Sequence, residues 1–177
     1  MGTAADSLNH EDIELVNLAQ GRDLDGNPTG DASQMVTEKL RKLVLARNDA
    51  NELWGWKDPS ADLYLETISD VLRNPFVLFV NRDMAAIAQS ELSQTQGSIE
   101  QAFEQALLRF GRYWELLQRL QWPTLLVSYE RAALNSEALL CEVADFIGLP
   151  PPTERQKTAV KAFAFERTYR QITQSLE

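Results

Sequence analysis

The sequence predicts an α/β fold built around a parallel sheet. Short apolar segments of strand character alternate with segments of helical periodicity, and the connections between them are long enough to hold crossover helices. The chain has 177 residues, of which 44% are hydrophobic and 24% are charged, a composition typical of a globular domain with its own core. We therefore expect one domain over residues 1–177, with a flexible segment at residues 1–10.

Three strand candidates carry this prediction. Residues 53–57 are short, aromatic and apolar, residues 124–127 are apolar, and residues 76–80 read F-V-L-F-V without a polar interruption. The last pattern is typical of a parallel strand that is buried on both faces. The three candidates are followed by the polar pairs Lys57-Asp58, Arg82-Asp83 and Tyr129-Glu130.

Helical patterns fill the intervals between the strand candidates. They predict helices over residues 11–19, 31–46, 58–72, 98–121 and 135–147, and a last one from Thr153. The helix over 98–121 has the strongest pattern, because Ser98 and Gln101 form a capping box and an apolar stripe including Phe103, Leu107 and Trp114 is expected to face the core. Cys141 lies between apolar neighbours and is expected to fill core space.

Charge and composition exclude several classes of function. The net charge of −9 opposes general binding to nucleic acid or to an anionic membrane, because both require a positive field. No apolar run is long enough to span a bilayer, the N-terminus lacks a secretion signal, and a single cysteine fits a reducing compartment. We expect a cytoplasmic protein with no membrane span, no nucleic-acid partner and no bound metal.

The carboxyl ends of the predicted strands are where a ligand site is expected. Ligands of open parallel sheets bind beyond these ends, near the N-termini of the following helices. The planar fork of Arg82 suits a phosphate, and Ser90 adds a hydroxyl donor within two turns of a helix that begins near Met84. An ion pair between Arg82 and Asp83 that caps this helix is the simpler alternative.

Residues 76–90 resemble a segment of the sulfotransferases that use 3′-phosphoadenosine 5′-phosphosulfate (PAPS). That segment is written F-V-x-x-V-R-D-P-x-x-x-x-x-S, and its arginine and serine bind the 3′-phosphate of the nucleotide. The resemblance implies this role for Arg82 and Ser90. Here Met84 stands in place of the proline and Asn81 precedes the arginine.

Two further segments resemble the same family in the same order. Residues 54–59 are similar to the W-G-W-K-D-P run of bacterial sulfotransferases, and the shorter K-D-P is shared with tyrosylprotein sulfotransferases, in which the lysine stabilises charge during transfer. Residues 125–130 and 146–150 resemble the V-x-Y-E-D-L and F-L-G-L-P pair, whose tyrosine contacts the adenine. The resemblance implies that Lys57 is catalytic and that Tyr129 binds cofactor. A strand-end ion pair for Lys57 and a partly buried core ring for Tyr129 are the structural alternatives.

The family resemblance implies a three-layer, P-loop NTPase-like sulfotransferase fold that is N-terminally incomplete. Members of the family hold the 5′-phosphosulfate with a loop such as R-S-G-T-S, and no such loop occurs in these residues. Residues 21–30 are no substitute, because no apolar strand precedes them and Asp23 and Asp25 would repel the ligand. Glu11 is the candidate general base, while the neighbouring His10 is expected to be a solvated surface residue.

Three functions follow from these observations. The first is a PAPS-dependent sulfotransferase with an unknown hydroxyl or amine acceptor, active if a 5′-phosphosulfate loop is supplied. The second is a silent module that binds adenosine 3′,5′-bisphosphate without turnover. The third is a protein-interaction module that uses the helix over residues 98–121, which exposed aromatic residues such as Trp114 would favour.

Overall fold

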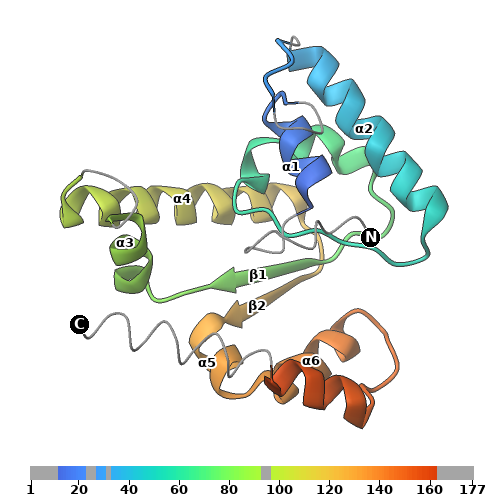
Figure 1. Cartoon of the computed structure of the whole chain (residues 1–177), viewed down its shortest axis with the longest axis vertical. Coiled ribbons are helices and arrows are strands. Elements are labelled where there is room, and N and C mark those ends of the chain that lie inside the picture. Colours follow the sequence, from blue (N-terminus) through green and yellow to red (C-terminus); the bar gives the residue numbers. More distant parts are fainter. Residues whose placement is uncertain (1–11, 23–26, 31–32, 93–96, 163–177) are drawn as a thin grey trace. The chain divides into compact units, whose positions relative to one another are not determined.

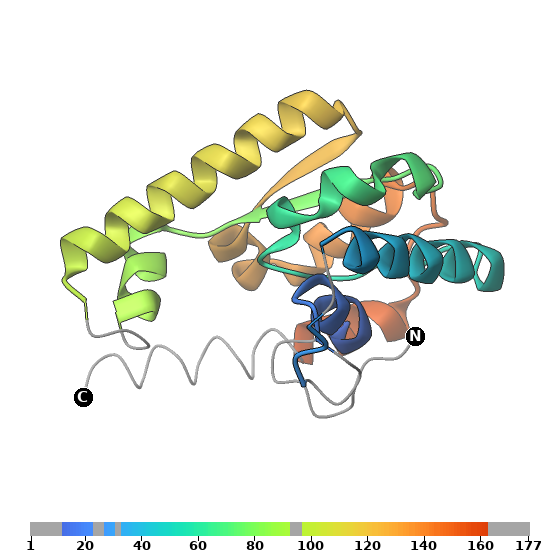
Figure 2. The same ribbon diagram turned by 90° about the horizontal axis from the view of Figure 1, so that it is seen from above.

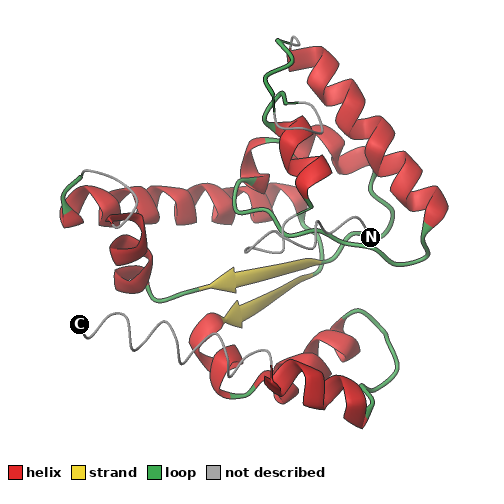
Figure 3. Ribbon diagram, viewed as in Figure 1, coloured by secondary structure: helices red, strands yellow, loops and turns green. Residues whose placement is uncertain are grey.

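The structure is a computed structural model that describes residues 12–22, 27–30, 33–92 and 97–162. Helices make up most of the described elements, and two strands form a small sheet (Figure 3). The chain groups into two compact units, one of residues 1–75 and 112–121 and the other of residues 76–111 and 122–177. The fold is therefore mixed α/β, as expected, and the single-domain assignment stays a prediction.

The first unit is helical. Its elements are α1 (Ile13–Ala19), α2 (Ser33–Ala50) and two short 3₁₀-helices, η1 (Ala61–Leu63) and η2 (Leu65–Val71) (Figure 1). Asp12 caps α1, because its carboxylate accepts a hydrogen bond of 3.2 Å from the amide of Leu15. The core of this unit includes four fully buried apolar side chains, Leu15, Leu40, Val44 and Ile68.

The second unit contains the sheet. Its elements are β1 (Val77–Asn81), α3 (Met84–Leu92), the first half of α4 (Ile99–Leu120), β2 (Thr124–Ser128), α5 (Tyr129–Leu134) and α6 (Ser136–Phe146). The strands β1 and β2 are parallel, with Val77 opposite Thr124 and Asn81 opposite Ser128. Figures 1 and 2 show them side by side and running in the same direction. The predictions of these two strands and of their parallel pairing are confirmed.

The prediction of a third strand over residues 53–57 is wrong, because these residues form an irregular loop. Side-chain hydrogen bonds, and not the backbone hydrogen bonds of a sheet, fix this loop. The indole N–H of Trp54 donates to Asn48, and that of Trp56 donates to Tyr64. The two indole rings also stack, with centroids 5.4 Å apart. The helix predicted over residues 58–72 is correspondingly broken into η1 and η2.

The prediction that residues 76–80 are buried on both faces is also wrong. Leu78 and Val80 are 44% and 55% exposed, and Leu126 on β2 is 63% exposed. Among the described residues the sheet has only two strands, so each strand has an edge without a ladder partner. A continuous apolar run indicates a strand but does not report how many layers cover it.

The strong pattern of the helix over residues 98–121 correctly predicted α4. Its capping box is formed, since Ser98 Oγ accepts from the amide of Gln101 at 3.3 Å and the Gln101 side chain accepts from the amide of Ser98 at 3.1 Å. The stripe is only partly buried: Ala102 and Ala106 are buried, whereas Phe103, Leu107 and Trp114 are exposed. Leu116, which is not part of the predicted stripe, is buried as well. Cys141 in α6 is exposed as well, so its prediction as core filler is wrong.

Candidate functional site

Arg82 lies at the junction between β1 and α3, where the sequence placed it. The strand ends at Asn81 and the helix begins at Met84, so Arg82 and Asp83 form the whole connection. Asp83 caps the helix, because its Oδ1 atom accepts a hydrogen bond of 3.0 Å from the amide of Ala86. The carboxylate of Asp83 therefore caps the helix backbone, as the structural alternative to a phosphate site supposed, and that alternative added an ion pair with Arg82.

Two contacts join the carboxyl ends of β1 and β2. The guanidinium carbon of Arg82 lies 5.2 Å from the centroid of the Tyr129 ring, a separation at which a cation and an aromatic face attract each other. One residue further along each of the two segments, the amide of Asp83 donates a hydrogen bond of 2.8 Å to Oε1 of Glu130. The structure thus brings Arg82 and Tyr129 together, as expected of residues at the same edge of a parallel sheet.

Glu130 also belongs to this site, although the sequence analysis assigned no role to it. Besides accepting from the Asp83 amide, its other oxygen accepts a hydrogen bond of 3.3 Å from the hydroxyl of Ser128. The hydrogen bond from the Asp83 backbone is the main reason why the pKa of Glu130 lies below its usual value. No sequence signal pairs Glu130 with Asp83, because 47 positions separate them.

These carboxylates define what an anion would meet at the start of α3. An exposed helix N-terminus normally offers its backbone amides to phosphate. Here the amides of Asp83 and Ala86 already donate to carboxylates. A phosphate at this edge would therefore find these two amides occupied, and the guanidinium of Arg82 and the hydroxyl of Ser90 are the side-chain donors that it could use.

Ser90 lies in the second turn of α3 and is exposed. The prediction that it follows within two turns of a helix beginning near Met84 is confirmed. Seven positions separate it from Asp83, so both residues lie on the same side of the helix. The second unit thus contains Arg82, Ser90 and Tyr129, all three of the predicted nucleotide-binding residues.

Lys57 belongs to the first unit and is exposed on the irregular loop over residues 54–59. The loop is held by its neighbours: Trp56 Nε1 donates to the Tyr64 hydroxyl at 2.9 Å, and that hydroxyl donates to Asp58 Oδ2 at 2.8 Å. The other oxygen of Asp58 accepts from the amide of Ser60 at 2.8 Å. The carboxylate of Asp58 therefore accepts hydrogen bonds from Tyr64 and Ser60.

Tyr64 was missed by sequence reasoning, although a signal existed. A tyrosine or tryptophan that is buried needs a partner for its polar atom, and residues 54–64 hold two tryptophans and one tyrosine near Asp58. Burial is the main cause that raises the pKa of Tyr64, and the charge of Asp58 adds to it. Tyr64 thus stays protonated and acts as a fixed donor to Asp58.

Glu11, the predicted base, and His10 lie outside the residues that the structure describes. The assignment of Glu11 as the base therefore stays a prediction. So do the absence of a metal and the identity of the cofactor.

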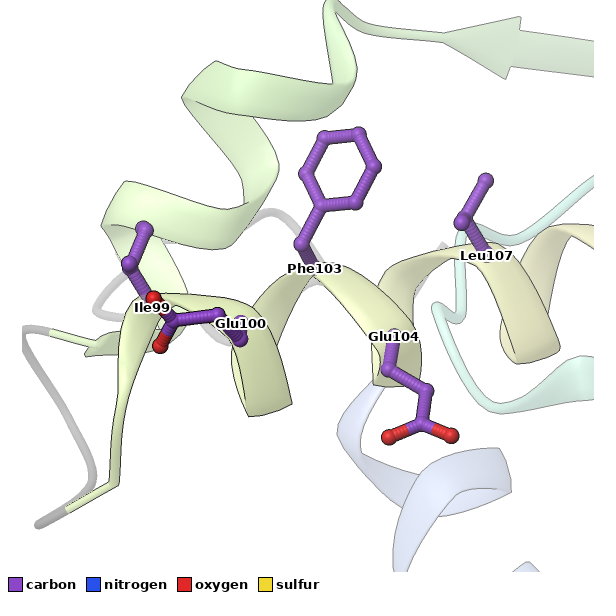
Figure 4. A pocket seen from close by; sticks show the side chains of 5 residues that line it. All are labelled: Ile99, Glu100, Phe103, Glu104 and Leu107. Atoms are coloured by element: carbon purple, nitrogen blue, oxygen red, sulfur yellow. The ribbon is translucent and has the colours of Figure 1, made fainter.

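An open hollow of about 400 Å³ lies on the first turns of α4, and none of the residues that line it is a predicted site residue. Figure 4 shows the side chains of Phe103 and Leu107 on one side of the helix and Glu104 on another. Ile99 and Glu100 complete its lining, and the atoms whose surface faces the hollow are almost entirely apolar. The hollow bears on the interaction hypothesis and not on the nucleotide site.

Comparisons of the chain with protein-family models, with curated proteins and with solved structures returned no match. Among the helices in the described part of the chain, none combines the length and the apolar character that crossing a membrane requires.

Proposed function

We propose that the chain is a sulfotransferase-family protein that binds the 3′-phosphate of PAPS at Arg82 and Ser90. The proposal includes the three-layer, P-loop NTPase-like architecture of that family and a 5′-phosphosulfate loop in addition to the residues described above. One observation carries it: Arg82 follows β1 directly, is held against Tyr129 at the end of the neighbouring parallel strand, and precedes the helix that bears Ser90. This is the edge of a parallel sheet where ligands bind.

The chemistry that we propose is transfer of a sulfuryl group to a hydroxyl or amine. The acceptor atom forms a bond to sulfur while the bond from sulfur to the bridging phosphate oxygen breaks. The electron pair stays on that oxygen, giving adenosine 3′,5′-bisphosphate, and the proton of the acceptor passes to a base, for which the sequence suggests Glu11. The ammonium group of Lys57 would stabilise the negative charge that develops on the leaving oxygen.

The Arg82→Ala substitution tests the nucleotide site. An arginine that donates charge-assisted hydrogen bonds contributes about 1.5–3 kcal/mol, so we expect binding of adenosine 3′,5′-bisphosphate to weaken by about 10- to 100-fold. Isothermal titration calorimetry measures this change. Adenosine 5′-monophosphate lacks the 3′-phosphate, and its binding should not respond to the substitution.

The matched control is Arg155→Ala, which removes an equal charge from an exposed position of the same unit. It should leave the affinity for the bisphosphate unchanged. Equal affinities of the wild type and Arg82→Ala would refute the site. Binding that depends on Arg82 without any transfer from PAPS would identify the silent nucleotide-binding module.

A second candidate function is protein interaction through α4. Exposed Phe103 and Leu107 line the hollow on this helix, and Trp114 is 47% exposed, as the interaction hypothesis expects. If the wild type binds no adenosine bisphosphate, this becomes the leading function. Leu107→Glu would then be expected to abolish any self-association of the wild type seen by analytical ultracentrifugation.

A further inference from the structure

The residues on either side of Lys57 are bonded to the same atom. Trp56 donates its indole N–H to the Tyr64 hydroxyl at 2.9 Å, and the hydroxyl donates to the carboxylate of Asp58 at 2.8 Å. One phenolic oxygen thus acts as acceptor toward residue 56 and as donor toward residue 58. The backbone that carries Lys57 is bracketed between these two hydrogen bonds.

Tyr64 is a rigid anchor for this bracket. It is only 6% exposed, and its sequence neighbours Leu65 and Ile68 are also buried. A buried ring in a packed interior has few alternative rotamers, so its hydroxyl is held at one place. The hydroxyl accepts from a neutral indole N–H and donates to a charged carboxylate, so its hydrogen bond to Asp58 is the stronger of the two.

Further contacts fix both ends of the loop. Trp54 stacks on Trp56, and its indole N–H donates to Asn48 of α2 at 3.0 Å. The hydroxyl of Tyr113 donates to the carbonyl of Pro59. The loop is therefore tied down on both sides of Lys57, while Lys57 itself is exposed.

We infer that Tyr64 is a positioning residue that holds Lys57 in a single orientation for transfer. This inference rests on the proposed role of Lys57 in stabilising the leaving oxygen. A cation stabilises developing charge efficiently only when its position is set before the reaction, because reorganisation then costs nothing. A displacement of about 1 Å in such a group can slow a reaction by about 100-fold.

Tyr64→Phe tests the inference, because it removes the hydroxyl and keeps the ring. The five lysines are labelled with ¹³C-methyl groups and followed by NMR, with the Lys57 signal assigned by Lys57→Arg. We expect the chemical shift of the Lys57 methyl signal to move toward its value in the unfolded protein, while the chemical shift of exposed Lys42 on α2 does not change. We also expect kcat for transfer from PAPS to fall by about 10- to 100-fold with an unchanged Kd for adenosine 3′,5′-bisphosphate.

A second variant guards against a failure of Tyr64→Phe to fold. Trp56→Phe keeps an aromatic ring beside Trp54 but removes the indole N–H that bonds to Tyr64 together with part of the ring system, and it should shift the Lys57 signal in the same direction. An unchanged Lys57 signal in the folded variants overturns the inference, as does a shifted signal with unchanged kcat. If the wild type binds adenosine 3′,5′-bisphosphate but transfers no sulfuryl group, the silent module remains as the function, and the Lys57 signal alone then decides whether Tyr64 holds this side chain.

Discussion

Individual side chains at the end of the sheet show how a small number of polar contacts define the candidate site. Arg82 faces the ring of Tyr129, and the next residue of each chain segment forms the hydrogen bond between Asp83 and Glu130. The contact with Tyr129 orients the guanidinium of Arg82. The hydrogen bond to Glu130 occupies the amide of Asp83, which could otherwise donate to an anion. At this scale the carboxylates of Asp83 and Glu130 occupy two backbone amides near the start of α3.

Glu130 gives a prediction on pH and stability. Its pKa is lowered in the folded protein, chiefly by the hydrogen bond from the Asp83 backbone, so its contribution is present above the unfolded pKa of about 4.3 and is lost as pH falls through the lower folded value. Glu130→Gln keeps an oxygen that accepts from Asp83 but does not titrate. We expect the free energy of unfolding to fall less steeply in Glu130→Gln than in the wild type between pH about 5 and 3.

Urea unfolding at a series of pH values measures this difference, with pH 7 as the reference for each protein. Other acids with lowered pKa values, such as Glu66 and Asp70, contribute equally to both proteins. If the free energy of unfolding changes with pH in the same way for both proteins, the hydrogen bond from Asp83 does not stabilise the charged form of Glu130.

At the scale of elements, the two strands differ in how their apolar residues are covered. Val80 and Val127 are opposite each other in the parallel register, yet Val80 is 55% exposed and Val127 is 6% exposed. The helices α5 and α6 follow β2 directly in the chain, and α5 contacts β2. Burial in this sheet therefore depends on the strand and not only on the face.

This asymmetry gives a matched pair of substitutions. Val127→Ala removes buried methyl groups and should lower the free energy of unfolding by about 1.5–3 kcal/mol, whereas Val80→Ala should lower it by less than about 0.5 kcal/mol. Chemical denaturation of the two variants measures both values. Equal losses at the two positions would mean that Val80 is covered in solution.

For the molecule as a whole, the net charge of −9 gives a prediction about polyanions. Without a net positive field, we expect binding to single-stranded or duplex DNA of arbitrary sequence to be weaker than about 0.1 mM at physiological salt. Fluorescence anisotropy with labelled 30-mers measures this affinity. Micromolar binding that weakens as salt is raised would contradict the expectation and reveal a local basic surface.

Much of the local structure could be predicted from the sequence because it depends on neighbouring residues. The apolar run before Arg82 indicated β1, the polar junction after it indicated that α3 begins near Met84, and the capping box at Ser98 indicated α4. The loop over residues 54–59 could not be predicted in this way. Its two tryptophans have high strand propensity, but side-chain bonds to Asn48 and Tyr64 outweigh that preference.

The sequence by itself determined the mixed α/β class, the parallel order of two strands and the position of Arg82 at the end of one of them. Periodicity and capping are properties of a few consecutive residues, so they can be read without coordinates. Only the tertiary structure decided that Glu130 meets Asp83, that Tyr64 brackets Lys57, and which apolar residues are covered. Such contacts join residues whose proximity depends on packing, and packing is a property of the folded chain as a whole.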